Sequence, residues 1–175
     1  SETAAIIQVN ELNDFINSLE NNDILSNIYN KDLKNVSQIL KNLNTTKQVY
    51  ISFADSTNSD YLILTENDST LFLLDSIPNR ISETLVDLKI EKTRIDTTTI
   101  YHKIIGNTFA GSNNLELIRT LNAKNENTEL SKLIETTDKK AVASIVFKSD
   151  ATNYSKLLFT TISNKNNSNF TVLDF

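Results

Sequence analysis

Residues 48–54 read QVYISFA and residues 61–65 read YLILT, with the polar run DSTNSD at 55–60 between them. Val49, Ile51 and Phe53 alternate with Tyr50 and Ser52, and such alternation is typical of a strand with one buried face. Asp, Asn and Ser suit the connection because their side chains hydrogen-bond the local backbone. The two segments predict an antiparallel hairpin, and the apolar run at 70–74 predicts a third strand of a β-meander.

Two amphipathic helices are predicted between a short β-prone run at Thr3–Val9 and this hairpin. Asn10 and Asp32 are residue types that cap helix N-termini, and apolar side chains recur at helical spacing after each. The first stripe consists of Leu12, Phe15, Ile16 and Leu19, and the second of Leu33, Val36, Ile39, Leu40 and Leu43. We expect both stripes to be buried against the sheet.

The segments that follow Pro78 are mixed in pattern. Ile81–Ile95 fits either a helix or a strand, whereas Ile100–Ile105 and Thr108–Ala110 flank Gly106-Asn107, a strong hairpin signal. Asn113 is predicted to cap a further helix, with Glu116 three residues later completing a capping box.

The last third of the chain resembles the first. Ala143–Ser149 (ASIVFKS) matches the pattern of Ala4–Asn10 (AAIIQVN). This similarity fits a duplicated unit, and it also fits any two strand–helix units. We expect residues 1–140 to form an α+β unit and residues 141–175 a strand–helix–strand segment, interpreted as the start of a second unit packed on the first. The final run, Phe170–Phe175, is expected to pair beside Ala143–Phe147.

These patterns together predict an α+β fold. We expect an antiparallel or mixed sheet with helices packed mainly on one face, because a meander leaves room for helices on its core side. A length of 175 residues suits about one domain. The apolar runs are strand-sized and far shorter than the roughly 20 residues of a membrane span, so no transmembrane segment is expected.

The composition excludes several function classes. The chain has no Cys, which excludes disulfide frameworks, thiolate zinc sites and Cys nucleophiles. With only two Gly, most Gly-rich phosphate loops are excluded as well. The net charge of −5 argues against nucleic acid as a partner, because phosphate binding needs clustered Lys and Arg. We therefore expect no cofactor and no intrinsic metal.

Several short segments resemble a family of exported bacterial envelope proteins of unknown function. They are Ala4–Val9 with Phe15 and Leu19, Phe109–Ser112 leading into Leu115–Leu117, and Ala143–Phe147. Members of this family look like long lipid-anchored or periplasmic chains built from α+β units. The resemblance implies a fragment of a larger protein that lies in the periplasm, at an outer-membrane anchor or on the cell surface, and it supplies no catalytic residues.

Two residues invite a catalytic interpretation. His102 is the only histidine, so a Ser-His-Asp triad would need it as the base, and a zinc site would need three carboxylates beside it. Alternation places it with Ile100 and Ile104, which favours a structural strand histidine. Ser112 follows Gly111, but the G-x-S-x-G pattern is incomplete, so a helix N-cap at Ser112 or Asn113 is favoured.

Four acidic residues in adjacent turns could meet around a calcium ion: Asp55, Asp60, Glu66 and Asp68. A dedicated calcium loop uses a Gly at its sharp turn and a distal Glu, and neither is present at the right spacing. Ordinary turn chemistry explains the same residues, so we assign no metal ligand and no catalytic residue.

The sequence therefore favours a non-enzymatic structural or interaction domain of a larger exported envelope protein. Its expected partners are other envelope proteins or further domains of the same chain. The alternative is a small-ligand or carbohydrate-binding domain with a groove between sheet and helices, contacted by Tyr50, Tyr61 and Tyr101. A carboxylate-dependent hydrolase is the third hypothesis. Beyond those tyrosines, the ligand-binding residues are unknown.

Overall fold

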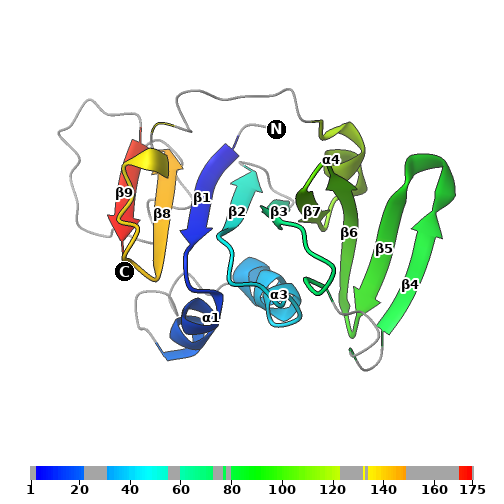
Figure 1. Cartoon of the computed structure of the whole chain (residues 1–175), viewed down its shortest axis with the longest axis horizontal. Coiled ribbons are helices and arrows are strands. Elements are labelled where there is room, and N and C mark those ends of the chain that lie inside the picture. Colours follow the sequence, from blue (N-terminus) through cyan, green and yellow to red (C-terminus); the bar gives the residue numbers. More distant parts are fainter. Residues whose placement is uncertain are drawn as a thin grey trace.

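One open antiparallel sheet organises the protein in the computed structural model (Figure 1). The structure describes residues 3–21, 31–54, 60–72, 77, 80–122, 132, 134–148 and 170–174. Within them the sheet has nine strands in the order β4-β5-β6-β7-β3-β2-β1-β8-β9. The strands are β1 Thr3–Val9, β2 Val49–Ala54, β3 Tyr61–Glu66, β4 Arg80–Leu85, β5 Ile90–Ile95, β6 Thr98–Ile105, β7 Thr108–Ser112, β8 Ala143–Lys148 and β9 Phe170–Asp174.

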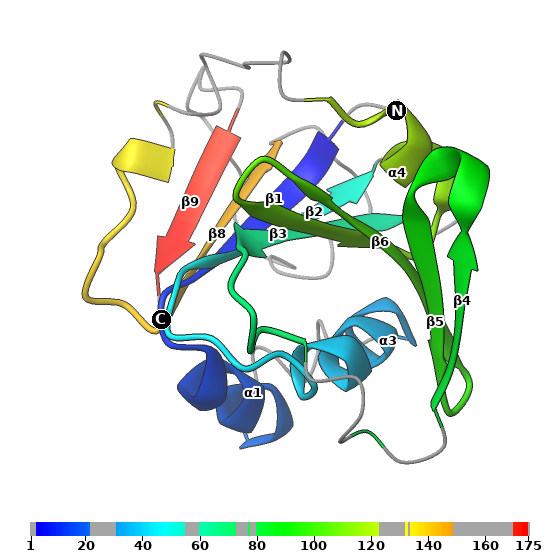
Figure 2. The same ribbon diagram turned by 45° about the vertical axis from the view of Figure 1, so that its right-hand side comes forward.

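The main core lies on one side of this sheet, which we call the first face. Alternation along β2 buries Val49, Ile51 and Phe53 there, as the sequence predicts. Two helices cover this face, α1 (Leu12–Asn21) and α3 (Lys31–Leu40), and in Figure 2 both lie on the same side of the central strands. The predicted stripes are confirmed as buried at Leu12, Phe15, Leu19, Val36, Ile39, Leu40 and Leu43, with Ile16 partly buried. The side chain of Leu33 lies outside the described residues.

The opposite side, the second face, carries a smaller apolar cluster. It joins Ile90 and Ala110 of the sheet to Ile118 of α4 (Leu115–Thr120), with Leu62 and Leu64 of β3 packed against it. Leu62 and Leu64 alternate with Tyr61 and Ile63 of the main core, so α4 packs opposite α1 and α3. The expectation that helices pack mainly on one face is therefore not confirmed. The physical reason is that the centre of the sheet is apolar on both faces: Phe109 of β7 lies in the main core, and the adjacent Ala110 packs in the cluster with Ile118 of α4.

The β2–β3 hairpin is confirmed, but residues 70–72 of the predicted third strand are not a strand, and residues 73 and 74 lie outside the described part of the chain. Residues 70–72 form a turn, and Leu71 enters the main core. The third strand beside β3 is instead β7, from the later hairpin with β6. The ambiguous stretch from Ile81 to Ile95 is β4 and β5, joined by a single 3-10 turn, η2 (Val86–Leu88), and by left-handed Lys89.

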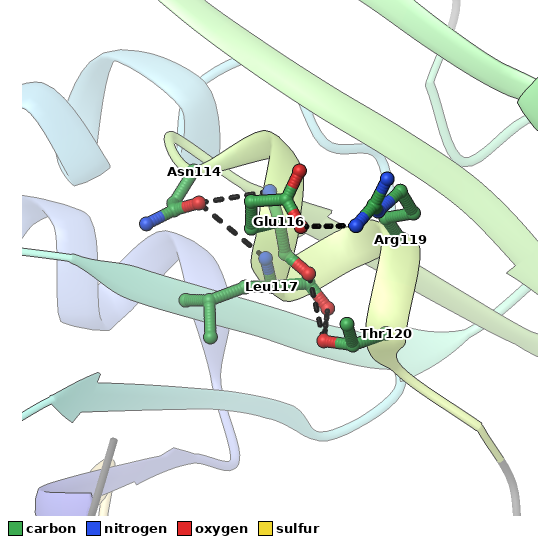
Figure 3. A network of polar contacts seen from close by, with 5 residues as sticks. All are labelled: Asn114, Glu116, Leu117, Arg119 and Thr120. Carbon is green, nitrogen blue, oxygen red and sulfur yellow. Dashed lines mark hydrogen bonds and ion pairs between the residues drawn. The ribbon is translucent and has the colours of Figure 1, made fainter.

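The predicted β6–β7 hairpin is confirmed, with Gly106 in the left-handed region at φ 59°. The cap of α4 is one residue later than predicted. Asn114 Oδ1 accepts hydrogen bonds from the backbone of Glu116 at 2.9 Å and Leu117 at 3.4 Å (Figure 3). Neither Ser112 nor Asn113 is available for capping, because both side chains bond the backbone of Tyr61. Glu116 pairs with Arg119 at 2.9 Å instead of closing a capping box.

The C-terminal strands extend the same sheet. β8 pairs antiparallel with β1, and β9 pairs antiparallel with β8, which confirms the predicted position of the final strand. The helix predicted between these two strands lies outside the described residues. The duplication and the boundary between residues 140 and 141 stay predictions.

Close packing around Gly111 on the first face makes it a sensitive position. A Cβ added there would meet Ile100 Cδ1 at 2.6 Å and Phe109 Cε1 at 3.1 Å. We expect Gly111→Ala to lower the free energy of unfolding by about 1–3 kcal/mol through overpacking, measured by urea denaturation. Gly106→Asn is the control, because its Cβ meets nothing within 4 Å and Asn tolerates a positive φ. Equal stabilities of the Gly111→Ala chain and the parent would contradict this packing.

Candidate functional site

An open groove of about 750 Å³ lies at one end of the second face. It forms where β2 begins, β3 ends and the β6–β7 turn closes, so segments distant in sequence build it together. We call it the polar groove, and its lining residues are Thr46, Lys47, Gln48, Tyr50, Leu64, Thr65, Glu66, Asn107 and Thr108. Its volume falls within the range of about 300–1,000 Å³ that is usual for ligand pockets.

One wall of the groove is a charged cluster around Glu66. Lys47 Nζ lies 3.5 Å from Glu66 Oε2, and Asn107 Nδ2 donates to Glu66 Oε1 at 3.4 Å. The side chains of Lys47 and Glu66 are 56% and 49% exposed, so solvent and ligand can both reach them. The backbone N–H of Asn67 donates to the carbonyl of Asn107 at 2.8 Å, which ties the β6–β7 turn to the end of β3.

A chain of side-chain hydrogen bonds leads from Tyr50 and Gln48 in the groove back to β1. Tyr50 Oη donates to Gln48 Oε1 at 2.8 Å, and Gln48 Nε2 donates to Asn10 Oδ1 at 2.8 Å. Asn10 Oδ1 also accepts from buried Gln8 at 3.0 Å. Partial burial raises the pKa of the Tyr50 phenol, so the hydroxyl stays a neutral donor at physiological pH. These contacts hold the Tyr50 ring at the groove.

The structure separates the three tyrosines that the sequence suggested as ligand contacts. Tyr50 lines the groove, whereas Tyr61 is 1% exposed in the main core on the first face. Burial raises the pKa of Tyr61, and its hydroxyl has no hydrogen-bond partner among the described residues. Tyr101 packs against the cluster that includes Ile118 of α4. The hypothesis placed the groove between sheet and helices, whereas this groove lies on the sheet face and has only Tyr50 of the three tyrosines in its lining.

Comparison with known proteins adds no relative. No protein-family model, curated protein or solved structure matches this chain. In the part of the chain that the structure describes, no helix combines the length and apolarity needed to cross a bilayer. The chemistry of the groove itself therefore carries the functional argument.

The acidic residues considered for calcium do not converge. Asp60 and Glu66 lie at opposite ends of β3, roughly 20 Å apart at the rise of a strand. Asp60 accepts from Asn114 Nδ2 at 2.8 Å. Asp68 accepts from the Thr70 hydroxyl and backbone, which lowers the pKa of its carboxyl, and the Lys47 charge adds to this effect. Asp55 lies outside the described residues, among which no three potential metal ligands cluster.

Ser112 and His102 point to opposite faces of the sheet. Ser112 pairs with Tyr101 across the β6–β7 ladder, so the neighbouring His102 faces the other way. Ser112 is fully buried, where its hydroxyl donates to the Tyr61 carbonyl and accepts from the Asn114 N–H at 3.0 Å. It therefore serves to join β7 to β3 and to the start of α4.

His102 lies in an aromatic pocket on the first face. Its ring contacts those of Phe72 and Phe109, with centroids at 5.3 and 5.4 Å, and its Nε2 lies 3.2 Å from Thr93 Oγ1. Burial lowers the pKa of the imidazole to about 4, and the nearby Glu91 charge opposes this only in part. His102 is thus a neutral core residue, consistent with the structural interpretation of its sequence context.

The lowered pKa of His102 predicts an acid-sensitive stability. The unfolded imidazole takes up a proton near its ordinary pKa of 6.5, whereas the folded one resists protonation down to about 4. Between these values the unfolded state binds more protons, so stability falls as the pH falls, by roughly 2–3 kcal/mol in total. His102→Gln should lose this part of the pH dependence in urea titrations at pH 7, 5.5 and 4. The same slope in parent and variant would show that His102 does not contribute.

Proposed function

We propose that the chain is a non-enzymatic interaction domain of a larger exported envelope protein, and that it binds an envelope component in the polar groove. The observation that carries this proposal is the preset geometry of the groove. Tyr50, Gln48 and Asn10 form one hydrogen-bonded chain, and Lys47, Glu66 and Asn107 form another. A site whose polar groups are already held in place loses less conformational entropy on binding.

Binding rather than catalysis is supported by where the reactive side chains lie. His102 and Ser112 are buried on opposite faces of the sheet, and neither lines the groove. The groove presents amides, hydroxyls, one ammonium and one carboxylate, which are groups suited to recognition by hydrogen bonding.

The proposed location is the periplasm, an outer-membrane anchor or the cell surface. It rests on the resemblance of Ala4–Val9, Phe109–Ser112 and Ala143–Phe147 to the envelope family. Other envelope components, or further domains of the same protein, are the proposed partners. The groove also favours the second hypothesis, a carbohydrate-binding domain, because Tyr50 lies beside polar groups of both hydrogen-bonding types.

The test is retention of the purified chain by isolated cell envelopes of the organism that makes it. Thr108 is exposed on the groove wall, so Thr108→Lys should place a long charged side chain in the groove and weaken retention about tenfold. Thr97→Lys is the matched control, because it makes the same change at an exposed turn at the opposite end of β6.

Cosedimentation measures the bound fraction of the parent chain and both variants. Retention of the parent and the Thr97→Lys chain, with loss for Thr108→Lys, supports the proposal. No retention of the parent, or equal retention of all three chains, overturns it.

A further inference from the structure

We propose that the ligand of the polar groove is a neutral oligosaccharide. This inference rests on the proposed function, since it names the chemical class of the component that the groove binds. It is carried by three properties of the lining: its balanced charge, its mixture of donors and acceptors, and its apolar floor.

The charges that line the groove cancel locally. Lys47 is the cation and Glu66 the anion among the lining residues, and they lie 3.5 Å apart. Asp68, close enough for Lys47 to influence its pKa, adds a further negative charge just outside the lining. An anionic ligand would be repelled by the carboxylates of Glu66 and Asp68. A cationic ligand would have to displace the Lys47 ammonium from beside these carboxylates. A neutral ligand incurs neither cost.

The polar groups match the hydrogen bonding of sugar hydroxyls. A hydroxyl donates one hydrogen bond and accepts others, so adjacent hydroxyls on a sugar ring need acceptors and donors side by side. Glu66 supplies the acceptor, with Lys47 and Asn107 as donors on either oxygen of its carboxylate. An exposed ion pair of this kind contributes little to stability, so sugar hydroxyls can share these groups at little cost.

The floor of the groove offers an apolar surface for the C–H face of a sugar ring. Tyr50 and Leu64 are directly opposite each other in the β2–β3 ladder, and both line the groove. Such opposite side chains have Cβ atoms about 4.5–5.5 Å apart, so the two form one continuous patch. The hydrogen bond from Tyr50 to Gln48 restrains the phenol ring at that patch.

The sheet topology disfavours an extended peptide as the occupant. A peptide that binds by strand addition needs a strand with an unpaired edge. The strands that line this groove are internal, because β2 lies between β1 and β3, and β3 and β7 likewise have neighbours on both sides. Recognition in the groove therefore depends on side chains.

The experiment is an NMR titration of the ¹⁵N-labelled chain with four probes. Neutral cello- and chito-oligosaccharides are the two expected ligand types, and an oligogalacturonate and an uncharged Ser/Gly-rich peptide represent the competing classes. We expect one neutral oligosaccharide to shift the amide signals of Lys47, Tyr50, Glu66 and Thr108 saturably. Comparison of the ¹⁵N spectrum of each variant below with that of the parent chain shows whether the variant is folded.

Glu66→Gln and Tyr50→Leu should each weaken that binding about tenfold. Glu83→Gln is the matched control, because Glu83 forms the equivalent exposed pair with Lys92 at 3.3 Å on β4 and β5, outside the groove lining. Unchanged binding by Glu83→Gln, with loss by the two groove variants, supports the inference.

The failures of the two proposals are distinguishable. If neither neutral oligosaccharide shifts the groove signals, or the oligogalacturonate or peptide shifts them instead, the carbohydrate inference is wrong. In that case, the proposed function would still hold if envelopes retain the parent chain and do not retain the Thr108→Lys chain. If the Thr108→Lys chain is retained by envelopes as well as the parent chain, the proposed function itself is wrong.

Discussion

The two-residue period of the central strands is the constraint on which the rest of the structure depends. Because of this period, Val49, Ile51 and Ile63 point into the main core, whereas Tyr50 and Leu64 point to the second face. A one-residue slip would exchange these sets, burying the groove side chains and exposing the core. The same period therefore creates both the stability of the sheet and the chemistry of its open side.

The groove exists because several turns meet at one end of these strands. The N–H of Asn44 donates to the carbonyl of Leu71 at 2.7 Å, and that of Asn67 to the carbonyl of Asn107 at 2.8 Å. Thr65 Oγ1 adds a bond to the Gln48 carbonyl at 2.9 Å. Because backbone groups make or accept these bonds, the positions of Lys47, Glu66 and Asn107 follow from the turns that carry them.

Local patterns predicted the parts of the fold that depend on neighbouring residues. The stripe at Leu12, Phe15 and Leu19 and the hairpin at Gly106-Asn107 are specified within a few residues, and both are confirmed. The insertion of β7 beside β3 and the packing of α4 on the second face depend on partners far along the chain, so periodicity did not reveal them. The N-cap of α4 is Asn114 rather than the predicted residue for the same reason, because the side chains of Ser112 and Asn113 hydrogen-bond the distant backbone of Tyr61.

The position of the groove could not be predicted, because its lining residues come from three separate segments and none belongs to a recognisable binding motif. The one signal in the sequence is Tyr50, a large aromatic side chain on the polar side of the alternating strand, which was suggested as a ligand contact together with Tyr61 and Tyr101. The three tyrosines looked equivalent in sequence. In the structure, however, Tyr61 is one of the β3 residues that point into the main core, and Tyr101 packs against the cluster that includes Ile118 of α4.

The size of α4 explains why part of the second face stays accessible. A six-residue helix is only about 9 Å long, whereas nine strands span roughly 38 Å across a sheet. Among the described elements α4 packs mainly over β6 and β7 on the second face, where Ala110 and Ile118 meet. No described helix lies above the side chains on the second face of β2, which favours Tyr50 over an aliphatic residue there. The need for polar contact with solvent and the proposed binding of a polar ligand thus favour the same side chains at this end of the sheet.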